Sequence, residues 1–317
     1  MISKSDDHYK KIFLKNQSFG EKEFITEGGF GYIYKSYLKR SKQEVAVKIL
    51  SLRNKDQRLA RSWFKNELNI LKLLNHPNII QVVYSNQSSF HFALPFANGG
   101  SLATFVQELT WSNQQVELTL HHIFRQLTGA VRYLHKNGVI HNDIKTDNVL
   151  VMTKESLPDV KLTDFDNSYY INTPIEKNCF PGTLQHAPPE QLKNYKLRES
   201  FLNNNSINMD IEYEQSTTAV DIYNIGLCLY ESMKRDYWCD MEESIDCCLS
   251  KMEGDNFVED LRSCLDNEVA FSENMYCFLN FCLKFNKDDR ATADELCSHV
   301  WLLNDVPSTL IEIMYEC

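Results

Sequence analysis

Cysteine pairs with metal-binding spacing are missing from this sequence. Ten cysteines are present, but no two of them form a C-x-x-C motif. Cys247 and Cys248 are adjacent, and adjacent cysteines rarely share a disulfide bridge and are poorly placed as a pair of zinc ligands. We therefore expect free thiols in a reducing compartment, the cytoplasm or the nucleus.

Long apolar runs and a secretory leader are missing as well. No run of about 18 apolar residues occurs, so we expect no membrane span. The first residues, MISKSDDHYKK, are polar and are not typical of a signal peptide. Cys317 is the final residue, which is the wrong position for a C-a-a-X prenylation signal.

An excess of positive charge is also missing. Lys and Arg number 33 against 43 Asp and Glu, which gives a formal net charge of −10. Nucleic acid is therefore a poor partner for the chain as a whole, although a local basic cleft is compatible with this total. What the 317 residues do contain is 43% hydrophobic and 12% aromatic side chains, enough for two domains or one large two-lobed domain.

The region from residue 24 to residue 96 favours short strands rich in β-branched and aromatic residues. The predicted strands are Phe24–Ile25, Tyr32–Tyr37, Glu44–Leu50, Ile79–Tyr84 and His91–Pro95. One helix is predicted at Trp63–Leu74, where apolar residues recur every three or four positions. The segment His76-Pro77-Asn78 then ends this helix.

After Asn98-Gly99-Gly100 the pattern becomes mainly helical. A long amphipathic helix is predicted at Leu118–Lys136, and Lys193–Thr218 is interpreted as a mobile polar surface loop. The other predicted elements are strands at Val139–His141, Val149–Met152 and Val160–Thr163, and helices at Val220–Met233, Cys239–Met252, Glu273–Phe285 and Ala293–Leu303. The pattern thus predicts a small strand-rich lobe with one helix, a hinge near Pro95–Asn98 and a larger, mainly helical lobe.

Two segments of the predicted small lobe suit phosphate binding. Glycines in Glu27-Gly28-Gly29-Phe30-Gly31 let a hairpin backbone approach phosphates, although an ordinary hairpin turn explains them equally well. Lys48 ends an apolar strand, where its ammonium group needs an anion, and Glu67 on the predicted helix is within reach. A solvated surface pair is the alternative for Lys48 and Glu67.

A loop in the predicted large lobe carries the more specific signal. It reads His141-Asn142-Asp143-Ile144-Lys145-Thr146-Asp147-Asn148 between apolar stretches. A carboxylate there can accept a hydroxyl proton, a lysine can neutralise a phosphate, and an asparagine oxygen suits Mg²⁺. Asp164-Phe165-Asp166 follows a short strand and supplies a second oxygen ligand.

Taken in order, these segments resemble the eukaryotic protein kinase family from about Phe24 to Leu303. Further landmarks of the family lie at Pro188-Pro189-Glu190, at Asp221 in D-I-Y-N-I-G, and at Arg290 in D-D-R-A-T-A-D-E-L. The resemblance implies an α+β, two-lobed kinase fold, in which a small antiparallel β-sheet lobe contains one key helix and the larger lobe is mainly helical. It places the kinase domain at residues 24–303, divided into lobes at 24–96 and 97–303 with a polar insert at 193–218. Residues 1–23 are then an N-terminal extension and residues 304–317 a C-terminal tail.

The resemblance implies a role for each matching residue. Asp143 would be the catalytic base, Lys145 would neutralise the transferred phosphoryl group, and Asn148 and Asp164 would hold Mg²⁺. ATP would be the phosphoryl donor. The residues implied in its binding are Gly28, Gly29, Gly31, Ile33, Ala46, Lys48, Glu67, Leu94, Phe96, Ala97, Leu150 and Asp164.

The same resemblance predicts specificity and one structural ion pair. Lys145 and Thr183 match positions that in Ser/Thr members lie together, with the threonine bonded to the catalytic Asp and Lys, so we expect Ser/Thr specificity. Glu190 and Arg290 are expected to form a buried ion pair within the large lobe.

Four departures from the family pattern are visible. Thr26 occupies the first glycine position of the glycine-rich loop, so we expect a stiffer loop and weaker ATP binding. Asn142 replaces an arginine that normally binds a phosphate on the activation loop, so activity should not depend on that phosphorylation. Asp166 replaces the glycine of D-F-G and is interpreted as a neutral surface replacement, with help in Mg²⁺ binding as the alternative. The insert is interpreted as a passive solvated segment, with a role in partner choice as the alternative.

The sequence therefore predicts an active Ser/Thr protein kinase that phosphorylates protein substrates in intracellular signalling. A pseudokinase scaffold or allosteric partner with the same fold is the alternative, and it would typically have lost one of the polar residues retained here. A small-molecule phosphotransferase of related fold shares the catalytic loop but lacks the later landmarks. No pattern predicts the substrate, the pathway or the oligomeric state.

Overall fold

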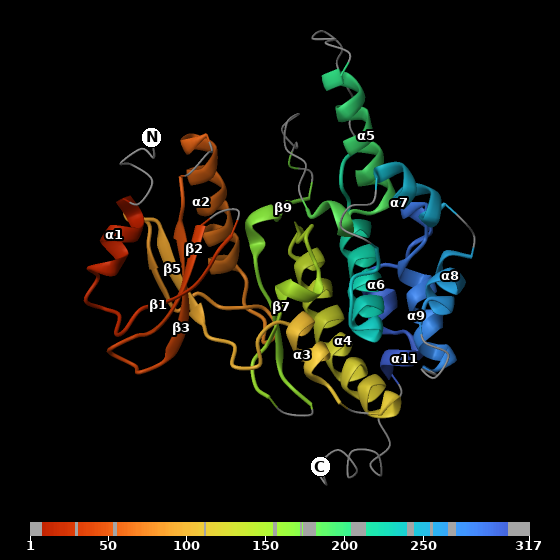
Figure 1. Cartoon of the computed structure of the whole chain (residues 1–317), viewed down its shortest axis with the longest axis horizontal. Coiled ribbons are helices and arrows are strands. Elements are labelled where there is room, and N and C mark those ends of the chain that lie inside the picture. The colour runs from red at the N-terminus through yellow and green to blue at the C-terminus, as the bar shows by residue number, and fades with distance from the viewer. Residues whose placement is uncertain are drawn as a thin grey trace.

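The computed structural model of this chain describes residues 8–28, 31–52, 56–110, 112–154, 157–171, 173, 182–203, 214–239, 244–253, 256–265 and 271–303. Its elements separate into a strand-rich small lobe, at the left of Figure 1, and a mainly helical large lobe. The predicted two-lobed α+β fold is confirmed. Within the described ranges, no helix is both long and apolar enough to cross a bilayer.

A five-stranded antiparallel sheet forms the small lobe. Its order is β1-β2-β3-β5-β4, and the strands are β1 Glu23–Glu27, β2 Gly31–Tyr37, β3 Glu44–Leu50, β4 Tyr84–Asn86 and β5 His91–Pro95. The β-branched residues Val45, Val47 and Ile49 of β3 are fully buried on one face of the sheet. Alternation along the strand therefore turns Ala46 and Lys48 toward the other face.

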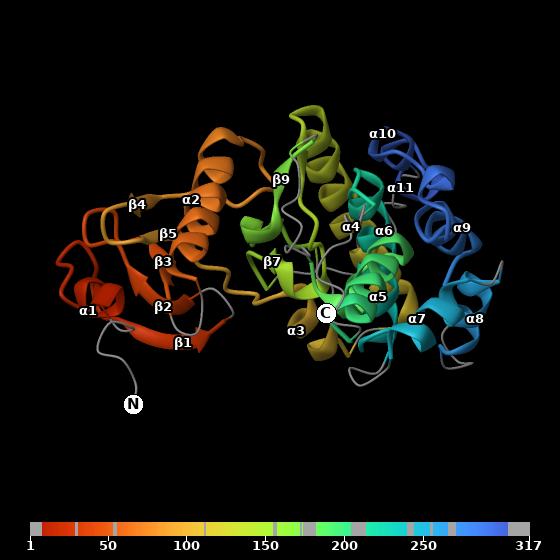
Figure 2. The ribbon, with the colours of Figure 1, turned by 90° about the horizontal axis from the view of Figure 1, so that it is seen from above.

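Helix α2, Gln57–Leu73, packs beside this sheet (Figure 2). It begins six positions before the predicted Trp63 because the Asp56 side chain accepts hydrogen bonds from Arg58 N and Leu59 N and caps the helix. Its buried residues include Phe64, Leu68 and Leu71 of the predicted apolar face, whereas Trp63 is only half-buried. Glu67 is buried as well, with only 2% of it exposed. A buried carboxylate requires a partner, and this partner belongs to the site described below.

Two features of the small lobe differ from the prediction. Helix α1, His8–Leu14, was not predicted, and its Tyr9 and Phe13 are buried against the sheet. The predicted strand Ile79–Tyr84 is wrong, because only Tyr84 belongs to a strand. Ile79 instead bridges to Leu162, and Ile80 N donates to Leu162 O, so this apolar run is buried where it crosses to the large lobe.

Helix α6, Ala219–Lys234, is the centre of the large lobe, and every residue from Val220 to Met233 is buried. Helices α4, Asn113–Lys136, and α9, Glu273–Cys282, pack against it (Figures 1 and 2). Ser112 and Gln115 form a reciprocal capping box that starts α4. The remaining large-lobe helices outside the insert are α3 Leu102–Glu108, α7 Ile245–Met252, α8 Phe257–Ser263, α10 Ala293–Cys297 and α11 Val300–Leu303.

Short strand pairs hold the loops that face the small lobe. β6, Val139–Ile140, pairs with β9, Tyr169–Tyr170, and β7, Val149–Val151, pairs with β8, Val160–Leu162. Three of these strands were predicted, and β9 was not. The predicted helices were less accurate at their ends: the helix predicted from Cys239 begins at Ile245, the one predicted to Phe285 ends at Cys282, and the one predicted at Ala293–Leu303 is divided into α10 and α11.

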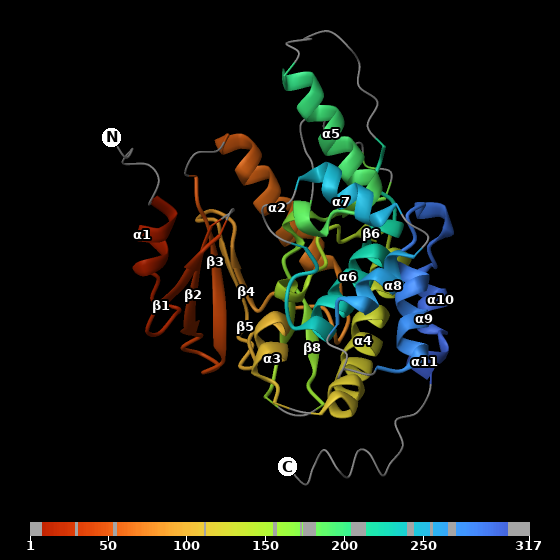
Figure 3. The same cartoon turned by 45° about the vertical axis from the view of Figure 1, so that its right-hand side comes forward.

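The polar insert is not simply a loop. Helix α5, Pro189–Asn203, includes its first half and extends from the top of the large lobe in Figure 3. The interpretation of Lys193–Thr218 as a loop is therefore wrong from Lys193 to Asn203, while residues 204–213 lie outside the described residues. Asn194 connects the two ends of the insert. Its Nδ2 donates to the backbone O of Glu214 at 2.8 Å, and its Oδ1 accepts from the backbone N–H of Glu214 at 3.0 Å.

Candidate active site

Lys48 lies among three carboxylates contributed by two lobes. Its Nζ is 2.8 Å from Glu67 Oε1, 2.8 Å from Asp164 Oδ1 and 3.6 Å from Asp166 Oδ2. Burial lowers the pKa of Lys48, but the nearby carboxylates outweigh it and hold that pKa well above its usual value. The structure thus brings Lys48, Glu67 and Asp164 together as predicted, and the surface-pair alternative is wrong.

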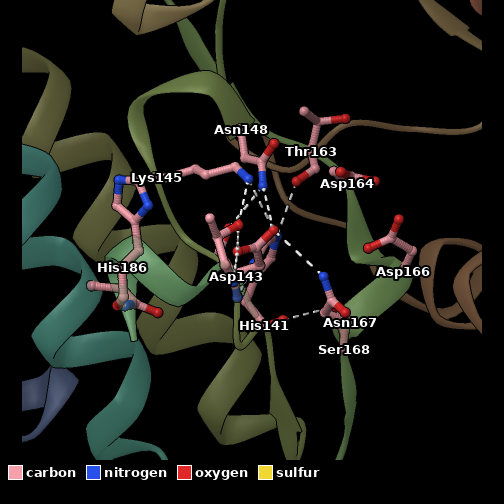
Figure 4. Close-up of polar contacts among 12 residues, drawn as sticks. His141, Asp143, Lys145, Asn148, Thr163, Asp164, Asp166, Asn167, Ser168 and His186 are labelled. Atoms are coloured by element: carbon pink, nitrogen blue, oxygen red, sulfur yellow. Dashed lines mark hydrogen bonds and ion pairs between the residues drawn. The ribbon is translucent and has the colours of Figure 1, made fainter. Parts of the chain in front are cut away.

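Asp166 is the residue that sequence reasoning placed incorrectly. Only 8% of it is exposed, so its interpretation as a surface replacement is wrong. Burial raises the pKa of its carboxyl well above the usual value, with Lys48 opposing this and the neighbouring carboxylates adding to it. Asp166 is drawn beside Asp164 in Figure 4. The alternative that it helps Mg²⁺ binding stays a prediction.

The loop His141–Asn148, which we call the catalytic loop, lies between β6 and β7 and is hydrogen-bonded to Asp221 of α6. Asp221 is fully buried, and its two carboxylate oxygens accept hydrogen bonds from His141 N at 3.0 Å and Asn142 N at 2.7 Å. Asn142 has a φ of +68°, a left-handed conformation that asparagine tolerates better than most residues. The sequence marked Asp221 only as a family landmark, and its contact with this loop became visible only in the fold.

Asp143 is the most connected side chain of the loop (Figure 4). Its Oδ1 accepts hydrogen bonds from Thr183 N at 2.9 Å and Thr183 Oγ1 at 2.8 Å, and its Oδ2 accepts from Asn148 Nδ2 at 3.2 Å. Lys145 Nζ donates to Thr183 Oγ1 at 2.6 Å and lies 3.4 Å from Asp143 Oδ2. The predicted contact of Thr183 with the Asp and the Lys is confirmed.

Asn148 and Asp164 are the candidate magnesium ligands. The amide nitrogen of Asn148 is used by Asp143, which leaves the amide oxygen for a cation. The backbone N–H of Thr163 donates to the backbone carbonyl oxygen of Asn148 at 3.0 Å. The next residue, Asp164, has a left-handed backbone conformation with a φ of +64°. These two donors fit Mg²⁺, which typically takes one or two protein oxygens and completes its shell with phosphates and water. Within the described ranges, no group of three His, Cys, Asp or Glu side chains is arranged to hold a metal ion.

His141 is a site residue that the sequence did not single out. Its Nε2 lies 3.0 Å from Thr163 O, and its ring centroid lies 4.7 Å from that of Phe165. These contacts fasten both sides of Asp164 to the catalytic loop. A histidine in an otherwise polar loop gives no signal for such a role, because its partners are more than twenty residues away.

Four of the residues predicted to bind ATP share one face of the sheet. Lys48 pairs with Ile33 on β2, and Ala46 pairs with Leu94 on β5, so these four side chains point to the same side. Leu150 on β7 forms an isolated antiparallel β-bridge with Ser101, the residue that caps α3. Phe96 and Ala97 form the connection between the lobes, with Phe96 N donating to Glu44 O at 3.1 Å.

The glycine-rich loop is only partly described. Gly28 N donates to Gly31 O at 2.9 Å, which closes the turn between β1 and β2. A Cβ on Gly31 would lie 2.0 Å from Ile49 O, so no side chain fits there. Gly29 lies outside the described residues, and the predicted effect of Thr26 on ATP binding stays a prediction.

Glu190 and Arg290 form the predicted ion pair of the large lobe. Arg290 Nη1 and Nη2 lie 2.8 and 2.7 Å from the two carboxylate oxygens of Glu190, a bidentate arrangement. The Glu190 side chain is 6% exposed and the Arg290 side chain is 0% exposed. This prediction is confirmed.

Comparison with known families agrees with this geometry. The family described as protein kinase domain matches residues 19–302. The chain belongs to the protein kinase family. This kinase is 26% identical over 309 residues to serine/threonine-protein kinase cds1 of Schizosaccharomyces pombe, covering 95% of the chain and 60% of that protein. It is 25% identical over 279 residues to calcium/calmodulin-dependent protein kinase cmkA of Emericella nidulans, covering 84% and 58%.

A third relative is serine/threonine-protein kinase RAD53 of Saccharomyces cerevisiae, 26% identical over 285 residues, which are 88% of this kinase and 32% of that protein. The chain spans about half the length of the curated relatives it matches, with shares of 60%, 51% and 40% for three of them. Their catalytic activity, substrates and partners therefore come to this chain only as proposals.

Proposed function

We propose that this kinase is catalytically active and transfers the γ-phosphate of Mg-ATP to Ser or Thr hydroxyls of protein substrates. The observation that carries the proposal is the convergence of Asp143, Lys145 and Thr183 in one hydrogen-bonded group. Lys48 with its carboxylates lies on the nucleotide side of the same site. We also propose that it acts in the cytoplasm or nucleus as a signalling enzyme, which suits the free thiols of the eight described cysteines.

The geometry supports a division of labour within the site. The substrate hydroxyl would form a bond to the γ-phosphorus while the bond from phosphorus to the β,γ-bridging oxygen breaks, which releases ADP. The hydroxyl proton would pass to the Asp143 carboxylate, whose Oδ1 is already oriented by two donors from Thr183. Lys145 would balance charge on the transferred group.

The small lobe would hold the donor nucleotide. Lys48 carries three N–H donors, of which two meet Glu67 and Asp164, so one is available for a phosphate oxygen. Asn148 and Asp164 would hold Mg²⁺. When bound, this cation would offset the negative charge of the phosphates.

Specificity for Ser and Thr is supported by the Lys145–Thr183 contact. The ammonium group of Lys145 lies within 2.6 Å of Thr183 Oγ1, next to the carboxylate that would accept the proton. The pseudokinase alternative is not favoured, because the polar residues that pseudokinases typically lose are all present here. They form two contact sets, Lys48 with Glu67 and Asp164, and Asp143 with Lys145 and Asn148.

The test is phosphate transfer from labelled ATP and Mg²⁺ to generic protein substrates, followed by phosphoamino-acid analysis. We expect label on Ser or Thr, and we expect Asp143→Asn to lower the rate by about 10²- to 10⁴-fold, the usual contribution of a general base. Transfer that is unaffected by Asp143→Asn would show that another group accepts the proton. No transfer from wild-type protein that still binds ATP would favour the pseudokinase.

A further inference from the structure

Gln191 of α5 reaches from the start of the polar insert to the catalytic loop. Its Nε2 donates to Asn142 Oδ1 at 2.8 Å and to Ser216 Oγ at 2.9 Å. Ser216 belongs to the far end of the insert, 25 residues later in the sequence. One amide group therefore connects the residue before Asp143 with both ends of the insert.

Gln191 also lies beside the segment that contains Thr183. Gly182 has a φ of +96°, and a Cβ placed on it would lie 2.9 Å from Asn142 O and 3.5 Å from Gln191 Oε1. The backbone of Gly182 therefore lies close against the Asn142 carbonyl oxygen, whereas Gln191 Oε1 is no nearer than ordinary van der Waals contact. The following residue, Thr183, makes the two hydrogen bonds to Asp143 Oδ1.

The side chains of this group are almost fully enclosed. Asn142 is 1% exposed and Gln191 is 4% exposed. The Asn142 side-chain oxygen accepts from a neutral amide, whose other partner is a hydroxyl, and Asn142 Nδ2 is buried without a hydrogen-bond partner among the described residues. This hydrogen-bonded connection is formed by neutral side chains of the protein, so it does not require a phosphate group on the chain.

We propose that Gln191 is a positioning residue for phosphoryl transfer, and that Ser216 makes the far end of the insert part of the same device. Gln191 acts through Asn142, which precedes Asp143 and whose carbonyl oxygen lies against Gly182, so that Asp143 and Thr183 are held in register with each other. The insert is then not a passive solvated segment. This inference rests on the proposed kinase function, because it assigns a role within that catalytic centre.

The experiment compares full-length variants of Gln191, Asn142 and Ser200. Gln191→Met keeps the length of the side chain but removes its hydrogen bonds, and Asn142→Gly removes the amide while keeping the positive φ. Ser200→Ala is the control, because Ser200 lies on the same helix, is exposed, and its hydroxyl donates to Lys196 O within that helix. We expect Gln191→Met to lower kcat about tenfold, as misplacement of a catalytic group does, with the KM for ATP unchanged.

The double variant separates positioning from general destabilisation. If Gln191 acts through Asn142, adding Gln191→Met to Asn142→Gly should lower kcat no further. Effects that multiply, or a Gln191→Met enzyme with the wild-type kcat, would overturn the proposal. Loss of kcat that follows only a lower melting temperature would also overturn it, and Ser200→Ala should change neither quantity.

Hydrogen exchange gives a readout that does not require enzymatic activity. In Gln191→Met, the peptides containing residues 141–144 and 182–184 should exchange faster, because Thr183 N loses the support of its bond to Asp143. Unchanged exchange there would overturn the inference even if wild-type protein transferred no phosphate. Faster exchange in Gln191→Met, found together with a wild-type protein that transfers no phosphate, would support the positioning role of Gln191. It would reject only the proposed kinase function.

Discussion

Glu67 is a single carboxylate whose ionisation decides whether Lys48 has its partner on α2. Burial raises the pKa of Glu67 to about 6, with Lys48 opposing that rise. Acidification through pH about 6 therefore protonates Glu67 and weakens its bond to Lys48. We expect kcat/KM for ATP to fall as the pH decreases through this value, measured as initial rates from about pH 5 to about pH 8.

The control for this pH dependence is Glu67→Gln, which should have low activity and no loss of kcat/KM around pH 6. If that variant keeps the same acidic limb, another group is responsible. Stability changes in the opposite direction, because the folded-state pKa of about 6 lies above the ordinary 4.5. The contribution of Glu67 to stability is therefore complete below pH 4.5 and is lost as the pH rises through about 6, so its protonation does not unfold the protein.

At the scale of elements, helix α1 is attached to the small lobe by aromatic contacts. The Phe13 ring lies 5.3 Å from Phe19 and 5.5 Å from Tyr34, centroid to centroid, and Arg61 of α2 donates to Tyr9 OH at 3.2 Å. Because Phe13 is fully buried, Phe13→Ala should cost about 3–5 kcal/mol of unfolding free energy in urea titrations.

Ile12→Ala is the matched control for α1. Ile12 neighbours Phe13 on the same helix but is 38% exposed, so its truncation should change stability far less. Equal losses from the two substitutions would mean that α1 contributes through helix formation and not through the contacts of Phe13.

Hydrogen bonds to the catalytic loop and to Gly138 hold the segment around β9. Ser168 is 2% exposed, and its hydroxyl donates to His141 O at 3.0 Å, while Ile171 N donates to Gly138 O at 2.7 Å. We expect phosphatase-treated protein, shown by mass spectrometry to carry no phosphate, to keep most of its activity. Full loss that is reversed by phosphorylation at Ser168, Tyr169, Tyr170 or Thr173 would contradict this prediction.

At the scale of the whole molecule, Glu190 and Arg290 join parts of the large lobe that are 100 residues apart. Arg290 also donates to the carbonyl oxygens of Lys284, Phe285 and Ala219. Arg290→Met should cost about 3–5 kcal/mol, because it leaves the Glu190 carboxylate buried without its partner. The measurement is urea unfolding followed by tryptophan fluorescence.

The double variant Glu190→Met/Arg290→Met tests the reason for that cost. Removing both charges leaves no uncompensated carboxylate, so the double variant should be more stable than Arg290→Met alone. A double variant that is the least stable of the set would mean that the pair itself, and not the orphaned charge, accounts for the loss.

The sequence by itself determined the two lobes, most of the strands and the membership of the site. Strand and helix periodicity are local, so Val45–Lys48 and Leu118–Lys136 could be assigned from neighbouring residues alone. The chemistry of Lys48, Asp143, Lys145, Asn148 and Asp164 is likewise carried by residue type and order. Elements without a clear apolar stripe were misjudged, as α5 shows: its polar sequence was interpreted as a loop.

Only the tertiary structure decided which side chains are buried and what they meet. Aspartate is a residue type that is usually exposed, yet the packing of α2 onto the segment after β8 encloses Asp166 beside Lys48. The bonds of Gln191 to Asn142 and Ser216 join residues 49 and 25 positions apart. The physical reason is that burial and hydrogen-bond partners depend on chain segments that meet only after folding, and a local pattern does not contain them.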